Sequence, residues 1–226
     1  MSNFTKFEIK NLIEKTGVVP VFYHPDLETC RGVLQAAYDA GYRVFEFTNR
    51  GENAFEIFLN LRKLVDTRLP GMALGIGTIT NAHDTRKFLQ ARADFIVSPI
   101  FKKEMANECN KGFKLFIPGC GTLTEIVEAH DAGALIVKVF PAGVLGPKFV
   151  SSVKEALPWL TLMPTGGVNP TEENMKEWFD AGVIAVGLGS KLFDKAALES
   201  KDFNTIRDSM SNALKIAEKI RSSSKK

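Results

Sequence analysis

The stretch Lys114–Pro141, KLFIPGCGTLTEIVEAHDAGALIVKVFP, contains one complete strand–helix–strand pattern. It begins and ends with a continuous apolar run, which is typical of strands buried on both faces of a parallel sheet. The segment between the runs begins with Thr122 and Glu125 at the spacing of a capping box, and it ends in Ala132-Gly133. A glycine at that point lets the chain turn back in the left-handed conformation. The stretch therefore predicts a parallel β–α–β unit.

The same alternation of apolar runs and helical patterns recurs along most of the chain. The runs are Val18–Tyr23, Arg43–Thr48, Ala73–Ile79, Phe95–Ile100, Lys114–Cys120, Leu135–Pro141, Thr161–Gly167 and Val183–Ser190. The helical patterns include Asp26–Ala40, Ala54–Asp66, Ala82–Ala91, Thr122–Ala132 and Pro170–Ala181. Eight strand–helix units in 226 residues predict an α/β fold, a (β/α)8 TIM barrel. A doubly wound open sheet is the alternative, but no GxGxxG motif follows the first run.

We expect a single domain over residues 1–226, because no shift in composition marks a boundary. Its parts are an extra N-terminal helix (1–16), the barrel core (17–193) and a C-terminal helix with a basic tail (203–226). The patterns Thr5–Lys15 and Phe203–Ile220 predict the two terminal helices. Asn169-Pro170 is expected to place proline in the first turn of a helix. Solvated, frayed ends are expected for the basic residues of the tail, Lys219, Arg221, Lys225 and Lys226.

The composition argues against several classes of function. The net charge is only +3, and no basic stripe with interleaved aromatic residues is present, so we expect no nucleic-acid partner. The cysteines and histidines lack the spacing of a disulfide framework or a metal site: Cys30, Cys109, Cys120, His24, His83 and His130. The chain begins without a signal-peptide core, and no apolar run is long enough to span a bilayer. We therefore expect a cytoplasmic protein with no membrane partner.

Lys138 interrupts the apolar run Leu135–Pro141 with a charge. Burial of an ammonium group is costly and lowers the pKa of a lysine. A lysine that is partly neutral near pH 7 is a nucleophile that forms a Schiff base with a carbonyl substrate. The alternative is a lysine whose stem packs at the strand end while its ammonium reaches water. The run alone does not choose between the two interpretations.

Other polar residues occur where the apolar runs end. In a (β/α)8 barrel the active site lies at the carboxyl-terminal ends of the strands, so these residues are candidates for the site. Glu46 lies between two phenylalanines, so alternation along a strand turns it toward the barrel interior, where burial raises a carboxyl pKa. It is a candidate general acid/base, or else a partner in an ion pair with Lys138 or Arg50. Arg50 offers a planar fork for a substrate carboxylate, unless it is an ordinary surface arginine. Thr78 follows a glycine and could hydrogen-bond the same carboxylate.

Two glycine-containing segments follow the last two runs. They are Thr165-Gly166-Gly167 and Gly187-Leu188-Gly189-Ser190. In barrels, the loops after strands seven and eight often bind phosphate through backbone amides and a short helix. The segment Ser190–Phe193 is expected to begin such a helix. Together the two segments predict a phosphate site.

In combination these motifs resemble those of the 2-keto-3-deoxy-6-phosphogluconate (KDPG) / 4-hydroxy-2-oxoglutarate (KHG) aldolases, class I. The resemblance covers about Val18 to Phe193. The motifs that carry it are Glu46-Phe47-Thr48-Asn49-Arg50, Gly75-Ile76-Gly77-Thr78, Ser98-Pro99, Ile117-Pro118-Gly119, Lys138-Val139-Phe140-Pro141 and Pro164-Thr165-Gly166-Gly167. It implies a lyase that cleaves a 2-oxo acid to pyruvate and an aldehyde, with no metal or other cofactor. It also implies a homotrimer.

The resemblance assigns a role to each candidate residue. Lys138 matches the Schiff-base lysine and Glu46 the general acid/base. Residues that match the pyruvate-binding positions are Arg50, Thr78, Phe140 and Pro99. Residues that match the phosphate-binding positions are Thr165, Gly166, Gly167, Gly189 and Ser190.

The chain departs from the family pattern near the expected rim of the site. Ile100-Phe101 follows Ser98-Pro99, Cys120-Gly121 follows Pro118-Gly119, and Asn49 stands where an aliphatic residue is common. These departures leave the preferred substrate open among KDPG, its galactonate isomer and KHG, and they leave the stereochemistry at C4 open. Cys120 is expected to be a small packing residue. Other classes also stay open: a metal-free barrel isomerase or synthase acting on a sugar phosphate, and a non-catalytic binder of an anionic metabolite.

Overall fold

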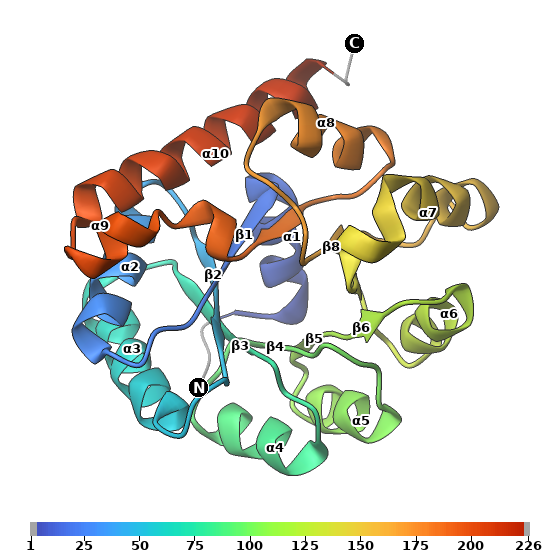
Figure 1. Ribbon diagram of the computed structural model, residues 1–226. Helices are drawn as coiled ribbons and strands as arrows, with labels where there is room; N and C mark the ends of the chain where they lie inside the picture. Colours follow the sequence, from blue (N-terminus) through green and yellow to red (C-terminus); the bar gives the residue numbers. More distant parts are fainter. Residues whose placement is uncertain (1–3, 224–226) are drawn as a thin grey trace.

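The computed structural model describes residues 4–223, which form an α/β fold (Figure 1). The strands are β1 (Val18–Phe22), β2 (Val44–Thr48), β3 (Ala73–Gly77), β4 (Phe95–Val97), β5 (Leu115–Ile117), β6 (Gly119–Cys120), β7 (Val137–Val139), β8 (Leu162–Pro164) and β9 (Val186–Leu188). The helices are α1 (Lys6–Thr16), α2 (Leu27–Asp39), α3 (Ala54–Arg68), α4 (Ala82–Gln90), α5 (Lys103–Lys111), α6 (Leu123–Asp131), α7 (Ala142–Ala156), α8 (Glu172–Asp180), α9 (Lys195–Glu199) and α10 (Phe203–Ser223), with a 3-10 turn, η1 (Ser190–Leu192).

The strands form a curled parallel sheet at the centre, and α2 to α10 lie outside it (Figure 1). Six strands pair in the order β5-β4-β3-β2-β1-β9, and three more pair in the order β6-β7-β8. The predicted parallel α/β architecture is confirmed. The predicted single sheet of eight strands is not, because Pro118 divides the fifth run into β5 and β6. Proline has no N–H to donate to the ladder, although its carbonyl accepts a 2.8 Å hydrogen bond from the Lys138 amide.

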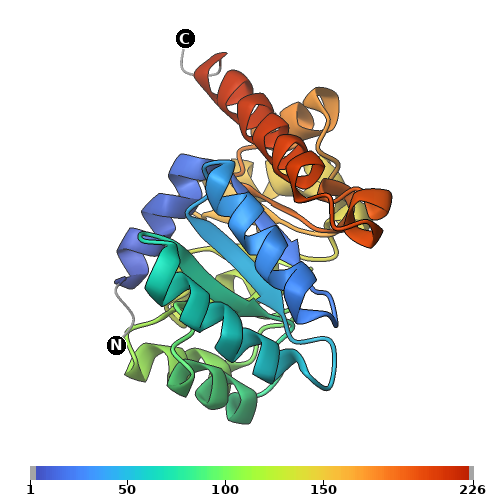
Figure 2. The ribbon, with the colours of Figure 1, turned by 90° about the vertical axis from the view of Figure 1, so that its left-hand side faces the viewer.

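A separate apolar cluster fills the interior of the curled sheet, and α1 contributes to it. Ile9 and Ile13 of α1 are fully buried against strand residues such as Val44, Phe95 and Met163. Figure 2 shows α1 at the end of the molecule opposite the strand arrowheads. The predicted N-terminal helix is therefore confirmed, and it covers the amino-terminal ends of the strands. The carboxyl-terminal ends are left open.

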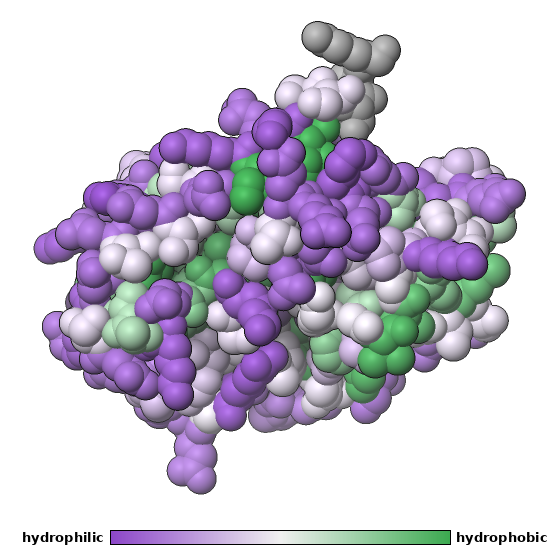
Figure 3. Space-filling view, turned by 45° about the horizontal axis from the view of Figure 1, so that its top comes forward, coloured by the Kyte–Doolittle hydropathy of each residue, from purple (hydrophilic) through white to green (hydrophobic). Residues whose placement is uncertain are grey.

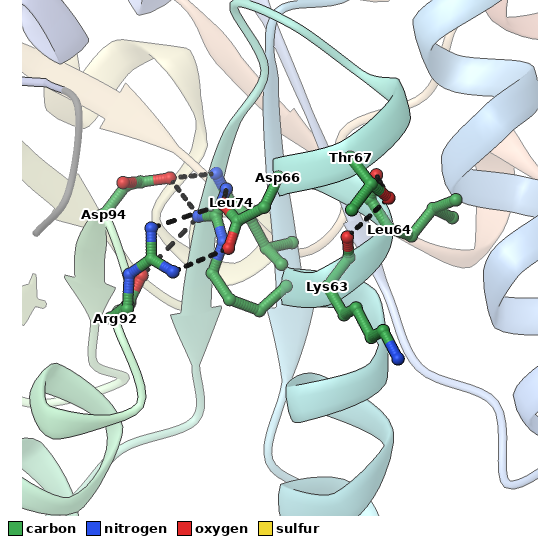
Figure 4. A network of polar contacts seen from close by, with 8 residues as sticks. Lys63, Leu64, Asp66, Thr67, Leu74, Arg92 and Asp94 are labelled. Carbon is green, nitrogen blue, oxygen red and sulfur yellow. Dashed lines mark hydrogen bonds and ion pairs between the residues drawn. The ribbon is translucent and has the colours of Figure 1, made fainter.

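A network of charged side chains fixes α3 against β3 and β4 at the same amino-terminal end (Figure 4). Asp94 accepts hydrogen bonds from Arg62 at 2.6 Å and from the backbone amide of Leu74 at 2.8 Å. Asp66 pairs with Arg62 at 2.9 Å and with Arg92 at 2.7 Å. Arg92, not glycine, provides the left-handed residue before β4, with φ +68°. These carboxylates are therefore engaged in holding the fold.

Helix starts agree with the sequence in one place and differ in another. The capping box predicted at Thr122 and Glu125 is confirmed at the start of α6. The prediction that Pro170 lies in the first turn of a helix is wrong. The hydroxyl of Thr171 accepts the amide of Asn174, which makes Thr171 the N-cap and leaves the proline outside α8.

The basic tail is more ordered than expected. Helix α10 continues to Ser223, three residues beyond its predicted end. Arg221 donates a 2.9 Å hydrogen bond to the carbonyl of Lys15, and Lys219 pairs with Glu172 at 2.7 Å. These contacts tie α10 to α1 and α8, so the prediction of a frayed end is wrong for Lys219 and Arg221. Lys225 and Lys226 lie outside the described residues.

The surface is mostly hydrophilic, with a hydrophobic patch near the right-hand edge of Figure 3. Large apolar side chains that are exposed include Val144, at 82%, and Trp159, at 64%. Trp178, by contrast, is buried in the core between sheet and helices. Among residues 4–223, no helix combines the length and the hydrophobicity needed to cross a membrane.

Candidate active site

The carboxyl-terminal ends of the strands surround a cavity of about 530 Å³. Every predicted site residue except Glu46 lines it: Arg50, Thr78, Pro99, Lys138, Phe140, Thr165, Gly166, Gly167, Gly189 and Ser190. These residues are far apart in sequence and come together because parallel strands end at the same edge. The structure also brings in residues that the sequence analysis did not select. Among them are Thr48, Lys191 and Lys195.

Lys138 lies at the centre of β7 and is only 5% exposed. Its backbone is held on both sides, by the carbonyl of Pro118 and by pairing with Met163 of β8. Burial lowers the pKa of the Lys138 ammonium, and Arg50 lowers it further, while the charge of Glu46 acts in the opposite direction. The ring of Phe140 lies 5.0 Å from Nζ. The lysine does not reach bulk water, so the interpretation of a strand-end lysine extended into solvent is not supported.

Glu46 lies on β2 below the cavity and is 1% exposed. Phe45 and Phe47 on either side pack into the outer core, which leaves the carboxylate on the inner face of the sheet. Burial raises the pKa of Glu46, and the positive charges of Lys138 and Arg50 oppose that rise. Among residues 4–223, Oε2 of Glu46 has no hydrogen-bond partner, and the positive charges of Lys138 and Arg50 act on the carboxylate only through space. The predicted alternative of a structural ion pair is therefore not supported.

Gly77 on the neighbouring strand makes room for this carboxylate. A Cβ atom at Gly77 would lie 1.9 Å from Oε1 of Glu46, far inside van der Waals contact. The side chain therefore passes across β3 at this glycine. In the register of the two strands, Gly77 is opposite Thr48, two residues nearer the cavity than Glu46.

Arg50 and Thr78 lie on the loops that follow β2 and β3, on the rim of the cavity. Thr78 has φ +61°, a conformation that is a genuine outlier for a β-branched residue. Such a conformation costs about 1–3 kcal/mol and is concentrated at functional sites. The strain points to a requirement for the Thr78 side chain or backbone at this position.

The other side of the cavity is formed by the two glycine segments. Gly166 and Gly167 both have positive φ, +83° and +87°, which glycine adopts without steric cost. A Cβ at Gly167 would lie 2.5 Å from the Cα of Gly143, so the backbones approach closely. Within residues 4–223, the amides of Gly166 and Gly167 donate no hydrogen bond. The predicted short helix is confirmed as η1, which begins at Ser190. These free amides are suited to an anion.

The charges on the cavity wall are all positive. Its lining contains Arg50, Lys138, Lys191 and Lys195 and, among the described residues, no aspartate or glutamate. Lys195 is 91% exposed and has only a distant partner, Glu199 at 3.8 Å. The arrangement suits a small molecule with negative charge at both ends.

Two other groups of residues are accounted for without chemistry. Cys120 is buried beside the site, its Sγ lies 3.4 Å from the carbonyl of Glu125, and burial raises the pKa of the thiol to about 12. It is a packing residue, as expected. A cavity of about 310 Å³ beside Arg62 and Asp94 is bordered by charges that pair with one another. Within residues 4–223, no group of three His, Cys, Asp or Glu side chains could hold a metal ion.

Comparisons with known proteins agree with this geometry. The family model of KDPG and KHG aldolase matches residues 9–209. The 2-dehydro-3-deoxy-phosphogluconate aldolase of Pseudoalteromonas atlantica is 29% identical over 209 residues, which cover 92% of this chain and 94% of the relative. The 2-dehydro-3-deoxy-6-phosphogalactonate aldolase of Escherichia coli is 32% identical over 151 residues, which cover 63% of this chain and 73% of the relative.

A solved structure leads to the same family. The KDPG aldolase of Legionella pneumophila, with pyruvate captured as a covalent carbinolamine intermediate, has a TM-score of 0.80 and 25% identity to this chain. The match covers 89% of this chain and 96% of that protein. Since the family model spans most of the sequence and the relative from Pseudoalteromonas atlantica matches nearly end to end, the chain belongs to the KDPG and KHG aldolase family.

Proposed function

We propose that this aldolase is a class I enzyme in which Lys138 forms a Schiff base with a 2-oxo acid. Its substrate is a 2-keto-3-deoxy-6-phospho sugar acid or 4-hydroxy-2-oxoglutarate. The products are pyruvate and an aldehyde, glyceraldehyde 3-phosphate or glyoxylate. The observation that carries the proposal is the buried amine of Lys138, which faces a cavity and whose pKa is lowered by its surroundings.

The reaction begins when the neutral amine of Lys138 attacks the C2 ketone. The carbinolamine loses water to give an iminium ion. Through a water, Glu46 removes the proton of the C4 hydroxyl, and the C3–C4 bond breaks as its electron pair moves toward the iminium nitrogen. The aldehyde leaves, and the enamine takes a proton at C3 from Glu46 through the same water. Water then releases pyruvate from Lys138.

One end of the cavity binds the 2-oxo acid carboxylate. Arg50 provides a planar pair of donors for it, and Thr78 adds a hydrogen bond from the strained turn after β3. Phe140 and Pro99 complete an apolar wall beside the reacting carbons. Exclusion of water by this wall lowers the pKa of the Lys138 amine and so favours its neutral form.

The other end binds the distal anion, and its charges favour a phosphorylated substrate. Gly166, Gly167, Gly189 and Ser190 offer backbone amides and a hydroxyl, with Thr165 at their base. Lys191 and Lys195 add two positive charges there, enough for a phosphate dianion. The galactonate isomer of KDPG is a second candidate substrate, because the 32% identical relative from Escherichia coli acts on 2-dehydro-3-deoxy-6-phosphogalactonate.

The decisive experiment is reduction with borohydride in the presence of pyruvate. We expect one adduct, on Lys138, and retro-aldol cleavage that is lost in Lys138→Ala and retained in Lys103→Ala, an exposed lysine outside the cavity. An adduct on another residue, or full activity of Lys138→Ala, would contradict the proposal. A sugar-phosphate isomerase or a non-catalytic binder would give no carbonyl-dependent adduct. Cleavage rates on KDPG, its galactonate isomer and KHG, measured side by side, then rank the substrates.

We also propose that the two sheets close into one (β/α)8 barrel and that the protein is a homotrimer. The parallel bridge between Thr165 and Gly187, which joins the sheets beside β8 and β9, supports closure. The exposed side chains of Val144, near the start of α7, and of Trp159, just beyond its end, support a subunit contact, since a contact between subunits would cover both. Sedimentation equilibrium is expected to give a mass three times the 24.9 kDa of one chain. A species with the mass of one chain would contradict the trimer. The single domain and the cytoplasmic location stay predictions.

A further inference from the structure

Asn53 is the N-cap residue of α3, but its side chain does not cap the helix. Asparagine is favoured at an N-cap because its side-chain oxygen accepts a backbone amide of the first turn. In this helix Oδ1 accepts a 3.1 Å hydrogen bond from the hydroxyl of Tyr23 instead, and Nδ2 donates a 2.8 Å hydrogen bond to the carbonyl of Pro25. Asn81, the N-cap of α4, shows the ordinary arrangement, in which Oδ1 accepts the amide of Asp84 at 2.8 Å. The Asn53 side chain therefore joins two loops and leaves its own helix uncapped.

Tyr23 also lies directly against the backbone of Gly51. A Cβ atom at Gly51 would be 1.8 Å from the hydroxyl oxygen of Tyr23 and 2.7 Å from its Cζ, so the tyrosine leaves no room for a side chain there. The backbone of Gly51 is not in the left-handed conformation, so it does not by itself require glycine. Phe47 of β2 supports the tyrosine ring, with the ring centroids 5.7 Å apart. Tyr23, which follows β1, therefore holds the loop after β2 at both Gly51 and Asn53.

Arg50 is part of the same loop and immediately precedes Gly51. Its exposed guanidinium lines the cavity, and within residues 4–223 it makes no hydrogen bond or ion pair. The direction of the side chain therefore depends on its own backbone. That backbone is fixed on one side by a 3.0 Å hydrogen bond from the Arg50 amide to the carbonyl of Thr48. On the other side it is fixed through Gly51, whose carbonyl accepts the amide of Ala54 at 3.0 Å. Movement of Gly51 would turn the guanidinium away from the planar, paired contact that a carboxylate needs.

Resting on the proposed function, in which Arg50 binds the carboxylate of the 2-oxo acid, we propose that Tyr23 and Asn53 are positioning residues. Their hydrogen bond, together with the contact of Tyr23 on Gly51, holds the loop after β2 in the conformation that directs Arg50 toward the carboxylate. A donor that is already in place loses less freedom on binding, so the substrate binds more tightly. Neither contact involves β7, so they act on binding of the 2-oxo acid and not on the reactivity of Lys138.

The test measures borohydride trapping of pyruvate over a range of pyruvate concentrations. It gives the concentration for half-maximal trapping and the rate at saturation. Tyr23→Phe removes only the hydroxyl, and we expect the half-maximal concentration to rise by about three- to tenfold, as for the loss of one hydrogen bond. The rate at saturation should stay within about twofold of wild type, because only binding is weakened. Asn53→Ala is expected to change the two values in the same way.

A matched control is Tyr38→Phe. The hydroxyl of Tyr38 also donates a 3.1 Å hydrogen bond, to the carbonyl of Pro70, in a loop at the amino-terminal end of the strands. This variant loses the same atom and a hydrogen bond of the same length, so it should lose a similar amount of stability in urea. We expect its half-maximal concentration to equal that of wild type. An equal rise in Tyr38→Phe and Tyr23→Phe would overturn the proposal.

A double variant tests whether Tyr23 acts through Arg50. Arg50→Ala is expected to weaken pyruvate binding, and addition of Tyr23→Phe should then change the half-maximal concentration by less than about twofold, because the group that is positioned is gone. If Tyr23→Phe keeps its full effect in Arg50→Ala, the tyrosine contacts the substrate itself and the proposal is wrong.

Substitution of Gly51 tests the close contact with Tyr23. In Gly51→Ala the new methyl group displaces the tyrosine hydroxyl, so we expect the same weakening of pyruvate binding as in Tyr23→Phe. Tyr23→Ala makes room for that methyl group, and it should give the same half-maximal concentration with and without Gly51→Ala. Effects of the two substitutions that simply add would contradict the proposal.

Wild-type pyruvate binding in both Tyr23→Phe and Asn53→Ala would also overturn the proposal. If Tyr23→Phe does not fold, Asn53→Ala is judged by the same criteria. If the wild-type protein traps no pyruvate at all, the proposed Schiff-base function fails. If it traps pyruvate and Arg50→Ala binds pyruvate as well as wild type does, only the positioning proposal fails, so the two failures are distinguishable.

Discussion

Burial acts in opposite directions on the pKa values of Lys138 and Glu46. It lowers that of the amine and raises that of the carboxyl, so it favours the neutral form of both. The charge of each group opposes the shift of the other. A neutral amine is the form that attacks a ketone, and a carboxyl with a raised pKa can both give and take a proton near neutral pH. Burial of the two groups therefore favours both the nucleophilic form of Lys138 and the acid/base role of Glu46.

This coupling predicts the pH dependence of Lys138. The amine becomes reactive as it loses its proton, so labelling by acetic anhydride should rise to a plateau at a pH below 10.5, the ordinary value for lysine. In Glu46→Gln the carboxylate that raises the pKa of Lys138 is gone, so the midpoint should move to still lower pH. The control Glu104→Gln, on an exposed side chain, should leave it unchanged. A midpoint that moves to higher pH in Glu46→Gln would contradict the coupling.

Site residues could be predicted from the sequence when their residue type was unusual for their position in a strand or helix. Lys138 and Glu46 are charges within apolar runs, and the runs showed where strands end. Thr48, Lys191 and Lys195 gave no such signal, because threonine is common in strands and exposed lysines are common everywhere. Only the fold shows that these three residues line the same cavity as Lys138.

At the level of elements, α1 is part of the interior core although it precedes the first strand. Its apolar stripe covers the amino-terminal ends of the strands, where Ile13 packs with Val44 and Phe95. We expect Ile13→Ala to lower the free energy of unfolding by about 2–5 kcal/mol in urea titrations. Activity per folded molecule should not change, because the cavity opens at the other end.

Lys10→Ala tests a partly exposed position on the flank of the same helix. Lys10 forms a partly exposed pair with Glu14 at 3.0 Å. Such pairs contribute little, so we expect a change of about 0.5 kcal/mol or less. A loss in Lys10→Ala as large as that in Ile13→Ala would mean that α1 does not act through the interior core.

The helices differed in how clearly the sequence predicted them. Helix α6 has a capping box and a terminal glycine, and it was predicted. Helix α7 begins directly after Pro141 and contains Gly146, with φ +74°, followed by Pro147, so it lacks a continuous helical pattern. Its first residues pack where the backbone of Gly143 meets that of Gly167. Tertiary contact at the site overrides local propensity there.

At the scale of the whole molecule, the net charge of +3 understates the field at the site. Four cationic side chains line the cavity, and among the described residues no carboxylate lines it. Low-dielectric walls focus such a field on an approaching anion. The predicted substrate carries a carboxylate and a phosphate, so its capture depends on this field.

We therefore expect kcat/KM for KDPG to fall by at least about threefold between 0.01 and 0.15 M ionic strength, as the Debye length shrinks from about 30 to 8 Å. The double variant Lys191→Ala, Lys195→Ala should lose most of this salt dependence. The double variant Lys102→Ala, Lys103→Ala removes the same charge outside the cavity and should keep it. Equal slopes in the two variants would contradict focusing at the site.

The sequence by itself determined the parallel α/β architecture and the identity of the Schiff-base candidate. Strand and helix periodicity is local, and a lysine within an apolar run is visible without a structure. Only the tertiary structure decided that Pro118 divides a strand, that α1 seals the interior, and that Thr48 lines the same cavity as Lys138. These three features depend on strand register and on how closely neighbouring strands approach. They bring together residues that are far apart in the sequence, and no local pattern predicts such contacts.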